Sequence, residues 1–278
     1  MAVGGGPLRP GEEDNFPDAV ASPVSGEVEF DRIAPVYDET RRAPSEEETA
    51  ALADLLEGCR TVLDAGVGTG RFAVPLHARR FEIVGVDLSL EMMRRARAKG
   101  ISDLVRADLR RLPLSDRAVD AAFMAHVLQL LPDPRGVLAE LGRVARRAVV
   151  VQLPEWPDRP PTEAWRSRRQ RYREIAAELG HPLPERRPRY RHTLEELSEI
   201  APPTTVREVP GQAPGLRRPG EGRPRWDPAW FGVSIPPEVH AEIVRRLEAE
   251  HPVDASAGPR PRSTRFLLWN PLRLRVPQ

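Results

Sequence analysis

The chain has 278 residues, enough to bury a sizeable core as one large α/β domain or two small ones. Its formal net charge is +1, and its cations are almost all arginine, because Lys99 is the single lysine. Such a balance does not indicate a general nucleic-acid binder. Since Cys59 is the single cysteine, an intrachain disulfide and a cysteine-built metal site are excluded. We expect a cytoplasmic protein without a metal.

The first 26 residues have neither the basic leader nor the apolar core of a signal peptide. We therefore expect residues 1–26 to be a disordered N-terminal tail and residues 27–278 to form a single domain. No window approaches 18 uninterrupted apolar residues, so the sequence predicts no membrane-spanning helix.

From about residue 45 to residue 153, strand and helix signals alternate in the rhythm of a parallel sheet covered by helices. Ser45 and Glu48 form a capping box that starts the first helix, and Ser89 is placed to cap a later one. Short buried-type runs predict strands at 61–66, 82–87, 103–108, 119–125 and 147–153. Helical spacing predicts helices at 49–59, 71–80, 89–100 and 132–145.

Beyond residue 153 prolines and arginines become frequent, and the remaining elements are more widely spaced. The patterns predict helices at 162–180, 193–201 and 236–251, and strands at 204–209 and 265–274. We expect these two strands to complete the same sheet. Insertions at about 154–192 and 210–255 would then form a helical cap on it.

The stretch VLDAGVGTGRF, residues 62–72, is typical of a nucleotide-binding turn between a strand and a helix. A Walker-type phosphate loop needs lysine after its last glycine, and Arg71 stands there instead. The dinucleotide fingerprint needs glycine at position 71, so an NAD site is weakened as well. What remains is D-x-G-x-G-x-G, with Asp64 two residues before Gly66.

Acidic residues follow the next two predicted strands, where ligands of a parallel sheet bind. Asp87 is placed to accept the hydroxyl groups of a ribose, and Asp108 to accept a hydrogen bond from an exocyclic amine such as that of adenine. Leu88 and Met92 are four residues apart at a helix start, so they share one face and could hold a flat base. Together these residues predict a pocket for an adenosine without a pyrophosphate.

The region from about residue 30 to residue 153 resembles the class I S-adenosylmethionine-dependent methyltransferases. The resemblance rests on VLDAGVGTGRF, VGVDLSLEMMRRA, RADLRRLPLSDRAVDAAF and AHVLQLLPD, which occur in the order and spacing of that family. FDRIAPVYDETR also resembles the N-terminal segment of the type 11 subgroup, relatives of the ubiquinone and menaquinone biosynthesis methyltransferases. The resemblance implies a Rossmann-like α/β fold, with a seven-stranded, mostly parallel sheet whose last strand is antiparallel and helices on both faces.

The resemblance further implies S-adenosylmethionine as cofactor. Asp64 would lie near its ammonium group, Asp87 would bind the ribose, and Asp108 and Leu109 would meet the adenine. The glycines would border the methionine part. The cofactor-binding residues implied are Tyr37, Arg41, Asp64, Gly66, Gly68, Gly70, Asp87, Leu88, Met92, Asp108, Leu109 and Ala125.

His126 would face the sulfonium and the acceptor, so it is the first candidate for a catalytic base; a packing role is the alternative. Acceptor-binding candidates come from the predicted cap, where they would form a lid over a small molecule. These are Trp156, Trp165, Arg169, Tyr172 and Tyr190. A patch for RNA and a merely solvated, arginine-rich helix face are the alternatives.

We therefore predict a methyltransferase that acts on a small-molecule acceptor by in-line methyl transfer. The alternatives are an RNA methyltransferase and a catalytically inactive, S-adenosylmethionine-binding regulatory protein. The sequence predicts neither the identity of the acceptor nor the oligomeric state.

Overall fold

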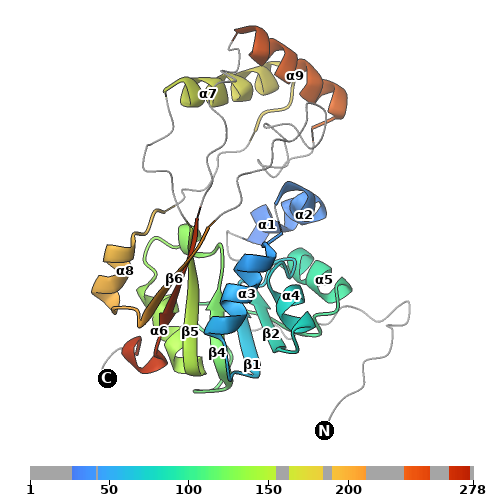
Figure 1. Ribbon diagram of the computed structural model, residues 1–278. Coiled ribbons are helices and arrows are strands. Elements are labelled where there is room, and N and C mark those ends of the chain that lie inside the picture. The colour runs from blue at the N-terminus through green and yellow to red at the C-terminus, as the bar shows by residue number, and fades with distance from the viewer. Residues whose placement is uncertain are drawn as a thin grey trace, which may run out of the picture.

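The computed structural model describes residues 27–41, 43–154, 163–183, 190–210, 235–250 and 263–275. One sheet of seven strands has the order β3-β2-β1-β4-β5-β7-β6 (Figure 1). The strands are β1 (Thr61–Ala65), β2 (Glu82–Asp87), β3 (Asp103–Arg106), β4 (Val119–Met124), β5 (Ala145–Pro154), β6 (Thr205–Val209) and β7 (Thr264–Trp269). Neighbours from β3 to β5 are parallel, and β7 runs antiparallel to β5 and β6. The predicted fold class is confirmed.

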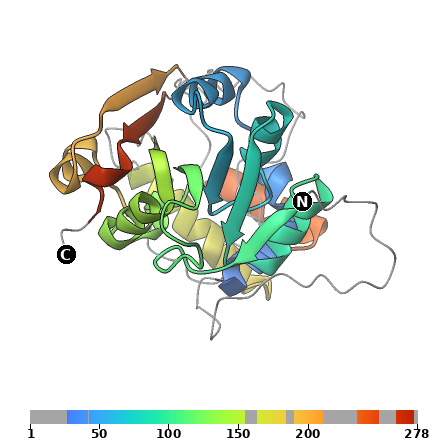
Figure 2. The ribbon, with the colours of Figure 1, turned by 90° about the horizontal axis from the view of Figure 1, so that it is seen from below.

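Helices cover both faces of this sheet, which Figure 2 shows from the amino ends of the parallel strands. On one face lie α3 (Glu46–Leu55), α4 (Ala73–Ala78) and α5 (Leu90–Ala98), and on the other α6 (Arg135–Val144) and α8 (Leu194–Ile200). The predicted caps are confirmed at α3, where Ser45 and Glu48 form a capping box, and at α5, where Ser89 accepts from the Met92 amide.

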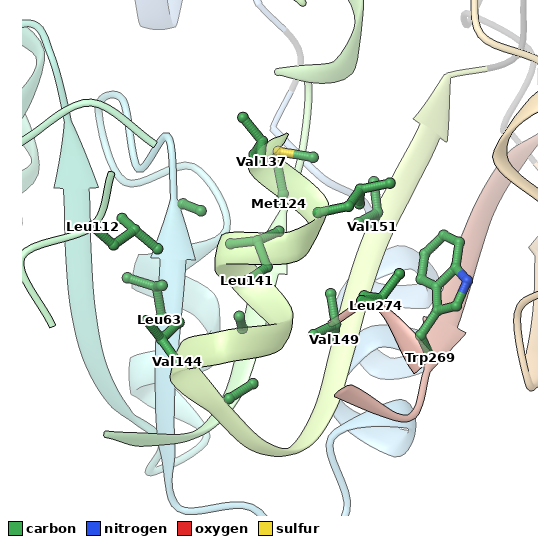
Figure 3. Packing of buried hydrophobic residues seen from close by; sticks show 14 of the residues in the cluster. Leu63, Leu112, Met124, Val137, Leu141, Val144, Val149, Val151, Trp269 and Leu274 are labelled. Carbon is green, nitrogen blue, oxygen red and sulfur yellow. The ribbon is translucent and has the colours of Figure 1, made fainter. Parts of the chain in front are cut away.

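Successive side chains of each central strand enter opposite cores, because strand side chains alternate between faces. Leu63 packs in the core under α6, whereas its neighbour Val62 packs under α3 and α4. Figure 3 shows Leu141 of α6 over the strand residues of the first core. At the far end of that core the fully buried Trp269 donates its indole N–H to the Ala201 carbonyl at 2.7 Å. The buried polar atom of this large side chain is therefore satisfied.

An N-terminal segment that our sequence analysis did not assign as helical packs beside α5. It consists of α1 (Glu27–Ile33), the short 3-10 helix η1 (Ala34–Val36) and α2 (Tyr37–Thr40). Ile33 and Ala34 bury their side chains against Met92 of α5. The tail predicted at residues 1–26 lies outside the described residues.

The helices predicted within the cap are present as α7 (Glu163–Glu178) and α9 (Pro237–Glu250), which lie side by side beyond the carboxyl ends of the strands (Figure 1). They share an apolar core of their own, in which Ile175 packs with Ile243. Arg171 joins them by an ion pair with Glu250 at 2.5 Å. Across the described ranges, none of the helices has the length and apolar character that crossing a membrane requires.

Two glycines of α6 allow a matched test of the packing between α6 and the 3-10 helix η4 (Pro271–Arg273). A methyl group on Gly142 would lie 2.8 Å from Leu274 Cβ and 2.9 Å from the Pro271 carbonyl oxygen, whereas one on Gly136 would meet nothing within 4 Å. We expect Gly142→Ala to lower the free energy of unfolding by about 1–3 kcal/mol through overpacking. Gly136→Ala should change it by less than about 1 kcal/mol. Urea unfolding measures both, and equal effects would contradict this account of the contact.

Candidate functional site

The turn between β1 and α4 carries three glycines with left-handed backbone angles. Their φ values are +86° at Gly66, +53° at Gly68 and +80° at Gly70, a region that favours glycine. A Cβ on Gly66 would lie 2.4 Å from Val127 Cγ2, so the chain packs closely there. A Cβ on Gly68 would meet nothing nearer than the Gly66 carbonyl oxygen at 4.0 Å. The backbone at Gly68 therefore borders space that a ligand can occupy.

The carboxylate of Asp87, at the end of β2, holds this turn against the start of α5. Its Oδ2 accepts the Gly68 amide at 2.8 Å, and its Oδ1 accepts the Ser89 amide at 2.9 Å. Burial raises the pKa of Asp87, and these two hydrogen bonds oppose that rise. Each carboxylate oxygen keeps a further lone pair, so Asp87 can still accept ligand hydroxyls.

Asp64 lies one strand away and is only 3% exposed. Burial and the nearby charge of Asp87 raise the pKa of Asp64 to about 7. Asp87 accepts the Gly68 amide, and Asp64 lies close enough to Asp87 that the two carboxyl groups are costly to ionise together. A bound ammonium group would favour the ionised form of Asp64, so this donor set fits a ligand with an amine and neighbouring hydroxyls.

On the side predicted for the adenine, Asp108 forms a bidentate ion pair with Arg110, with contacts of 2.5 and 3.0 Å. That pairing lowers the pKa of Asp108, which stays an acceptor. Leu109 Cδ1 reaches to 3.9 Å from the Cβ position of Gly66, so Leu109 borders the glycine turn. Leu88 is partly exposed beside this edge, and its carbonyl accepts from Arg106 at 3.1 Å.

Met92 is 1% exposed and packs against α1 and η1. This burial explains Met92 as a core residue and gives no support to its predicted contact with the adenine base. Its burial depends on the N-terminal segment that the sequence analysis did not assign.

Ala125 and His126 follow β4 directly, and His126 has the left-handed φ of +58°. Its ring lies 6.3 Å from that of Phe72. Burial and the charges of Arg71 and Arg41 lower the pKa of His126 to about 3. The imidazole is neutral at pH 7, and a group with so low a pKa accepts a proton poorly. This environment favours a positioning role for His126 over the predicted role as base.

Tyr37, Arg41 and Arg71 form a cationic group beside His126. The Arg41 guanidinium carbon lies 5.1 Å from the centre of the Tyr37 ring, and the Tyr37 side chain is hydrogen-bonded to Arg71. Arg71 was not among the predicted site residues. Its position directly after the last glycine was the available signal, but it served only as an argument against a phosphate loop and a dinucleotide site.

The sequence analysis also missed two acidic residues that hold the N-terminal segment in place. Asp38 accepts from the Thr69 hydroxyl at 2.6 Å and from the Lys99 ammonium at 2.6 Å, and Lys99 also donates to the Thr69 carbonyl at 2.8 Å. Burial raises the pKa of Asp38, but the hydrogen bonds from Lys99 and Thr69 outweigh it and leave the pKa low. The single lysine thus fastens α2 to the glycine turn.

The second of these residues, Asp31, accepts the Ser89 hydroxyl at 2.5 Å and the Glu91 amide at 3.2 Å. It therefore connects α1 to the same residue that Asp87 contacts. No motif in the sequence indicated this contact, because Asp31 and Ser89 are 58 positions apart.

The acceptor-binding candidates are dispersed. Tyr190 donates its amide to the Gln129 carbonyl at 2.9 Å, so it lies near the end of β4. Arg169 is partly buried in α7, and burial together with the charge of Arg173 lowers its pKa. Trp165 belongs to the first turn of α7, and Trp156 lies outside the described residues.

Tyr172 is 0% exposed between α7 and α9, where its hydroxyl is 2.8 Å from His240 Nδ1. This arrangement gives Tyr172 a packing role and does not support the predicted acceptor contact. The contact with α9 could not be foreseen from the helical pattern of α7 alone.

The sheet order, the glycine turn and the acid at the end of β2 define the class I S-adenosylmethionine-dependent methyltransferase fold. Residues 63–151 match the family model described as "Methyltransferase domain", of the type 11 group. This part of the chain is therefore similar to the methyltransferase domains that the model describes.

Curated relatives match the same region. A ubiquinone/menaquinone biosynthesis C-methyltransferase from Syntrophotalea carbinolica is 38% identical over 130 residues, 42% of this chain and 55% of the relative. A phosphatidylethanolamine N-methyltransferase from Cereibacter sphaeroides is 34% identical over 93 residues, 31% of this chain and 45% of the relative. The chain therefore spans about half the length of these relatives.

A solved structure of Haemonchus contortus phosphoethanolamine N-methyltransferase 2 with S-adenosylmethionine shares the fold. Its TM-score is 0.51 at 15% identity, and the match covers 86% of this chain and 56% of that one. At this identity the likeness concerns the fold and not the substrate.

The raised pKa of Asp64 makes stability depend on pH in the ligand-free protein. Between a typical unfolded value near 4 and the folded value of about 7, unfolding releases a proton, so burial of Asp64 destabilises increasingly as pH rises. We expect Asp64→Asn to raise the free energy of unfolding by a few kcal/mol, on the order of 1.4 per unit of pKa, above pH 7. The gain should shrink toward pH 5.

Urea unfolding at pH 5, 6, 7 and 8 measures this difference. The same variant should bind S-adenosylhomocysteine more weakly, because the carboxylate beside the ammonium is lost. A gain that is constant with pH, or larger at pH 5, would contradict the assignment.

Proposed function

We propose that this chain transfers a methyl group from S-adenosylmethionine to a small-molecule acceptor by in-line displacement. The observation that carries the proposal is the carboxyl edge of β1 and β2, where Asp87 contacts the open backbone at Gly68 and Asp64 lies near Asp87. These groups fit the amine and the ribose hydroxyls of the cofactor. A single cysteine is in keeping with a reaction in the cytoplasm.

The cofactor supplies an electrophilic methyl group on a sulfonium, whose transfer neutralises a cation. The residues of this chain then have to bind, orient and exclude water. Asp87 would hold the ribose, Asp64 the ammonium, and Arg41 the methionine end. Orientation of two reactants in this way can contribute about 7–11 kcal/mol to lowering the barrier in favourable cases.

The surroundings of His126 support transfer to an acceptor that needs no strong base from the protein. Its neutral imidazole lies where the resemblance puts the sulfonium and the acceptor. It would orient the acceptor as a hydrogen-bonding partner and would not take up its proton. Arg71 next to it would favour an acceptor that carries negative charge.

The helices beyond the carboxyl edge support a small acceptor over RNA. Arg171 of α7 is paired within the chain to Glu174, Glu178 and Glu250, so its charge is not available to phosphates. His192 Nε2 donates to the Leu131 carbonyl at 2.9 Å and, like Tyr190, fixes the chain beside the end of β4. A cap anchored there would enclose a small acceptor.

Gly68 and Gly100 provide a matched test of the donor site. Both have left-handed φ, +53° and +96°, and a Cβ would find no contact under 4 Å at either. Alanine at each should cost a similar 1–2 kcal/mol, roughly the penalty of that backbone region. We expect Gly68→Ala alone to weaken binding of S-adenosylhomocysteine at least tenfold, because its methyl group enters the cofactor space.

Calorimetric titration of both variants and the wild type with S-adenosylhomocysteine, S-adenosylmethionine and NAD measures this. Tight NAD binding with no response to the adenosyl sulfonium would overturn the proposal. Equal losses in Gly68→Ala and Gly100→Ala would overturn the placement of the cofactor at Gly68.

His126 can be tested without knowing the acceptor. Because its pKa is lowered to about 3, we expect its Cε1–H signal in NMR spectra to stay constant between pH 5 and 8. His126→Gln assigns the signal, and an exposed histidine, His77, serves as the comparison in the same spectra. An inflection of the His126 signal between pH 6 and 7 would return it to the role of catalytic base.

A further inference from the structure

A cavity of about 270 Å³ lies at the amino edge of the sheet, opposite the edge proposed for methyl transfer. We call it the arginine cavity, because arginine supplies most of its polar lining. The polar residues around it are Arg117, Arg146, Arg147, Asn270 and Arg275. Among the described residues that line it there is no carboxylate.

The direction of β7 explains how these residues meet. Arg146 and Arg147 are the second and third residues of β5, and Arg117 lies just before β4. Because β7 is antiparallel to β5, its carboxyl end reaches the same edge and brings the segment 270–275 against them. A second hollow of about 250 Å³ shares Arg147 and Asn270 with the arginine cavity.

The existing partners of these guanidinium groups leave many N–H donors unused. Arg147 donates to the Gly58 carbonyl at 2.6 Å, and Arg275 makes long contacts of 3.3 and 3.4 Å to the carbonyls of Gly142 and Arg143. Within the described ranges the Arg117 side chain has no hydrogen-bond or ion-pair partner. Uncharged carbonyls satisfy some donors but do not neutralise the charge.

Asp120 lies near the cavity and pairs with Arg146 at 2.9 Å, and Glu57 lines the neighbouring hollow that shares Arg147. Hydrogen bonds led by those from Thr61 lower the pKa of Asp120 to about 2, so it remains ionised. Four arginines line the cavity and no carboxylate among the described residues does, so its lining has a positive surplus. Like charges gathered in this way repel one another unless an anion is bound.

The backbone at Arg117 is in a conformation that arginine rarely adopts. Its φ is +55°, and its amide donates to the Arg143 carbonyl at the end of α6 at 2.9 Å. A non-glycine residue in this region costs roughly 1–2 kcal/mol. Arg117 is one of three non-glycine residues with positive φ in the described part of the chain, with Arg80 and His126, and residues of this kind occur at binding sites as well as in tight turns.

We propose that the arginine cavity binds a small molecule that carries two neighbouring phosphoryl groups. Guanidinium groups match phosphate oxygens in bidentate geometry. The cavity has room for about nine waters at roughly 30 Å³ each, more than one oxyanion requires. A diphosphate group also matches the surplus of charge.

This site is separate from the methyl-transfer edge. The ten residues of β5 join the two edges, and at about 3.3 Å per residue they span roughly 30 Å. A ligand in the arginine cavity would therefore not touch the cofactor or the acceptor. The proposal does not depend on the proposed function.

The test is calorimetric titration of the full chain with sodium pyrophosphate and, separately, with inorganic phosphate, at 50 and 300 mM KCl. We expect pyrophosphate to bind at least tenfold more tightly than phosphate, with weaker binding at the higher salt. Arg117→Gln should weaken pyrophosphate binding at least fivefold, and Arg117→Gln with Arg275→Gln at least fiftyfold. Arg207→Gln is the matched control, because Arg207 is exposed on β6 and does not line the cavity.

Circular dichroism confirms that each variant is folded, and S-adenosylhomocysteine affinity should be the same in all of them. In 50 mM KCl and without pyrophosphate, Arg117→Gln should also raise the melting temperature, because one of the repelling charges is removed. Equal binding of pyrophosphate by the wild type and Arg117→Gln, or an equal loss in Arg207→Gln, would overturn the proposal. Displacement of pyrophosphate by a single-stranded RNA at lower concentration would overturn it in favour of a nucleic-acid surface.

Discussion

A single carboxylate, that of Asp87, connects the sheet, the glycine turn and the helix that follows β2. It receives the amides of Gly68 and Ser89, and Ser89 in turn donates to Asp31 of α1. Removing a carboxylate from water is costly unless donors replace the lost hydration, and these backbone amides do so. The conformation of the ligand turn and the attachment of the N-terminal segment therefore depend on the same group.

For Asp64 the cost of removing the carboxylate from water is the larger effect. It lies beside Asp87 in a buried position where ionisation is unfavourable, so its pKa rises to about 7. The group is a cost to the ligand-free protein and a gain once a cation binds next to it. Local destabilisation of this kind is the usual sign that a site was shaped for a ligand and not for stability.

The sequence was sufficient for features that depend on neighbouring residues. The caps at Ser45 and Ser89 start helices as expected, and each run predicted as a strand became a strand of the sheet. Contacts between distant segments were not predictable. The bond of Asp38 to Lys99 joins residues 61 positions apart, and the burial of Tyr172 depends on α9. The alternation of apolar residues and the spacing of motifs give no information about contacts between residues far apart in the sequence.

The same limit applies to the predicted role of His126. Its position after β4 was enough to propose a base, but its pKa depends on Arg71 and Arg41, which the fold brings to it. A residue type and a place in a motif identify which atoms are near the reaction. The charge around those atoms decides what they can do, and for His126 that charge comes from two other parts of the chain.

An arginine indicates a ligand site in this protein only where it has no acidic partner. The chain has 42 basic and 41 acidic residues, so most arginines can be paired, as Arg143 is with Glu140 and Asp116. The arginine cavity departs from this rule, since four arginines and no carboxylate among the described residues line it. In a chain of nearly zero net charge, a bound anion would neutralise such a local surplus of positive charge. The two edges of the sheet then differ in sign: the carboxyl edge carries buried acids that a cationic ligand would relieve, and the amino edge carries arginines that an anionic ligand would relieve.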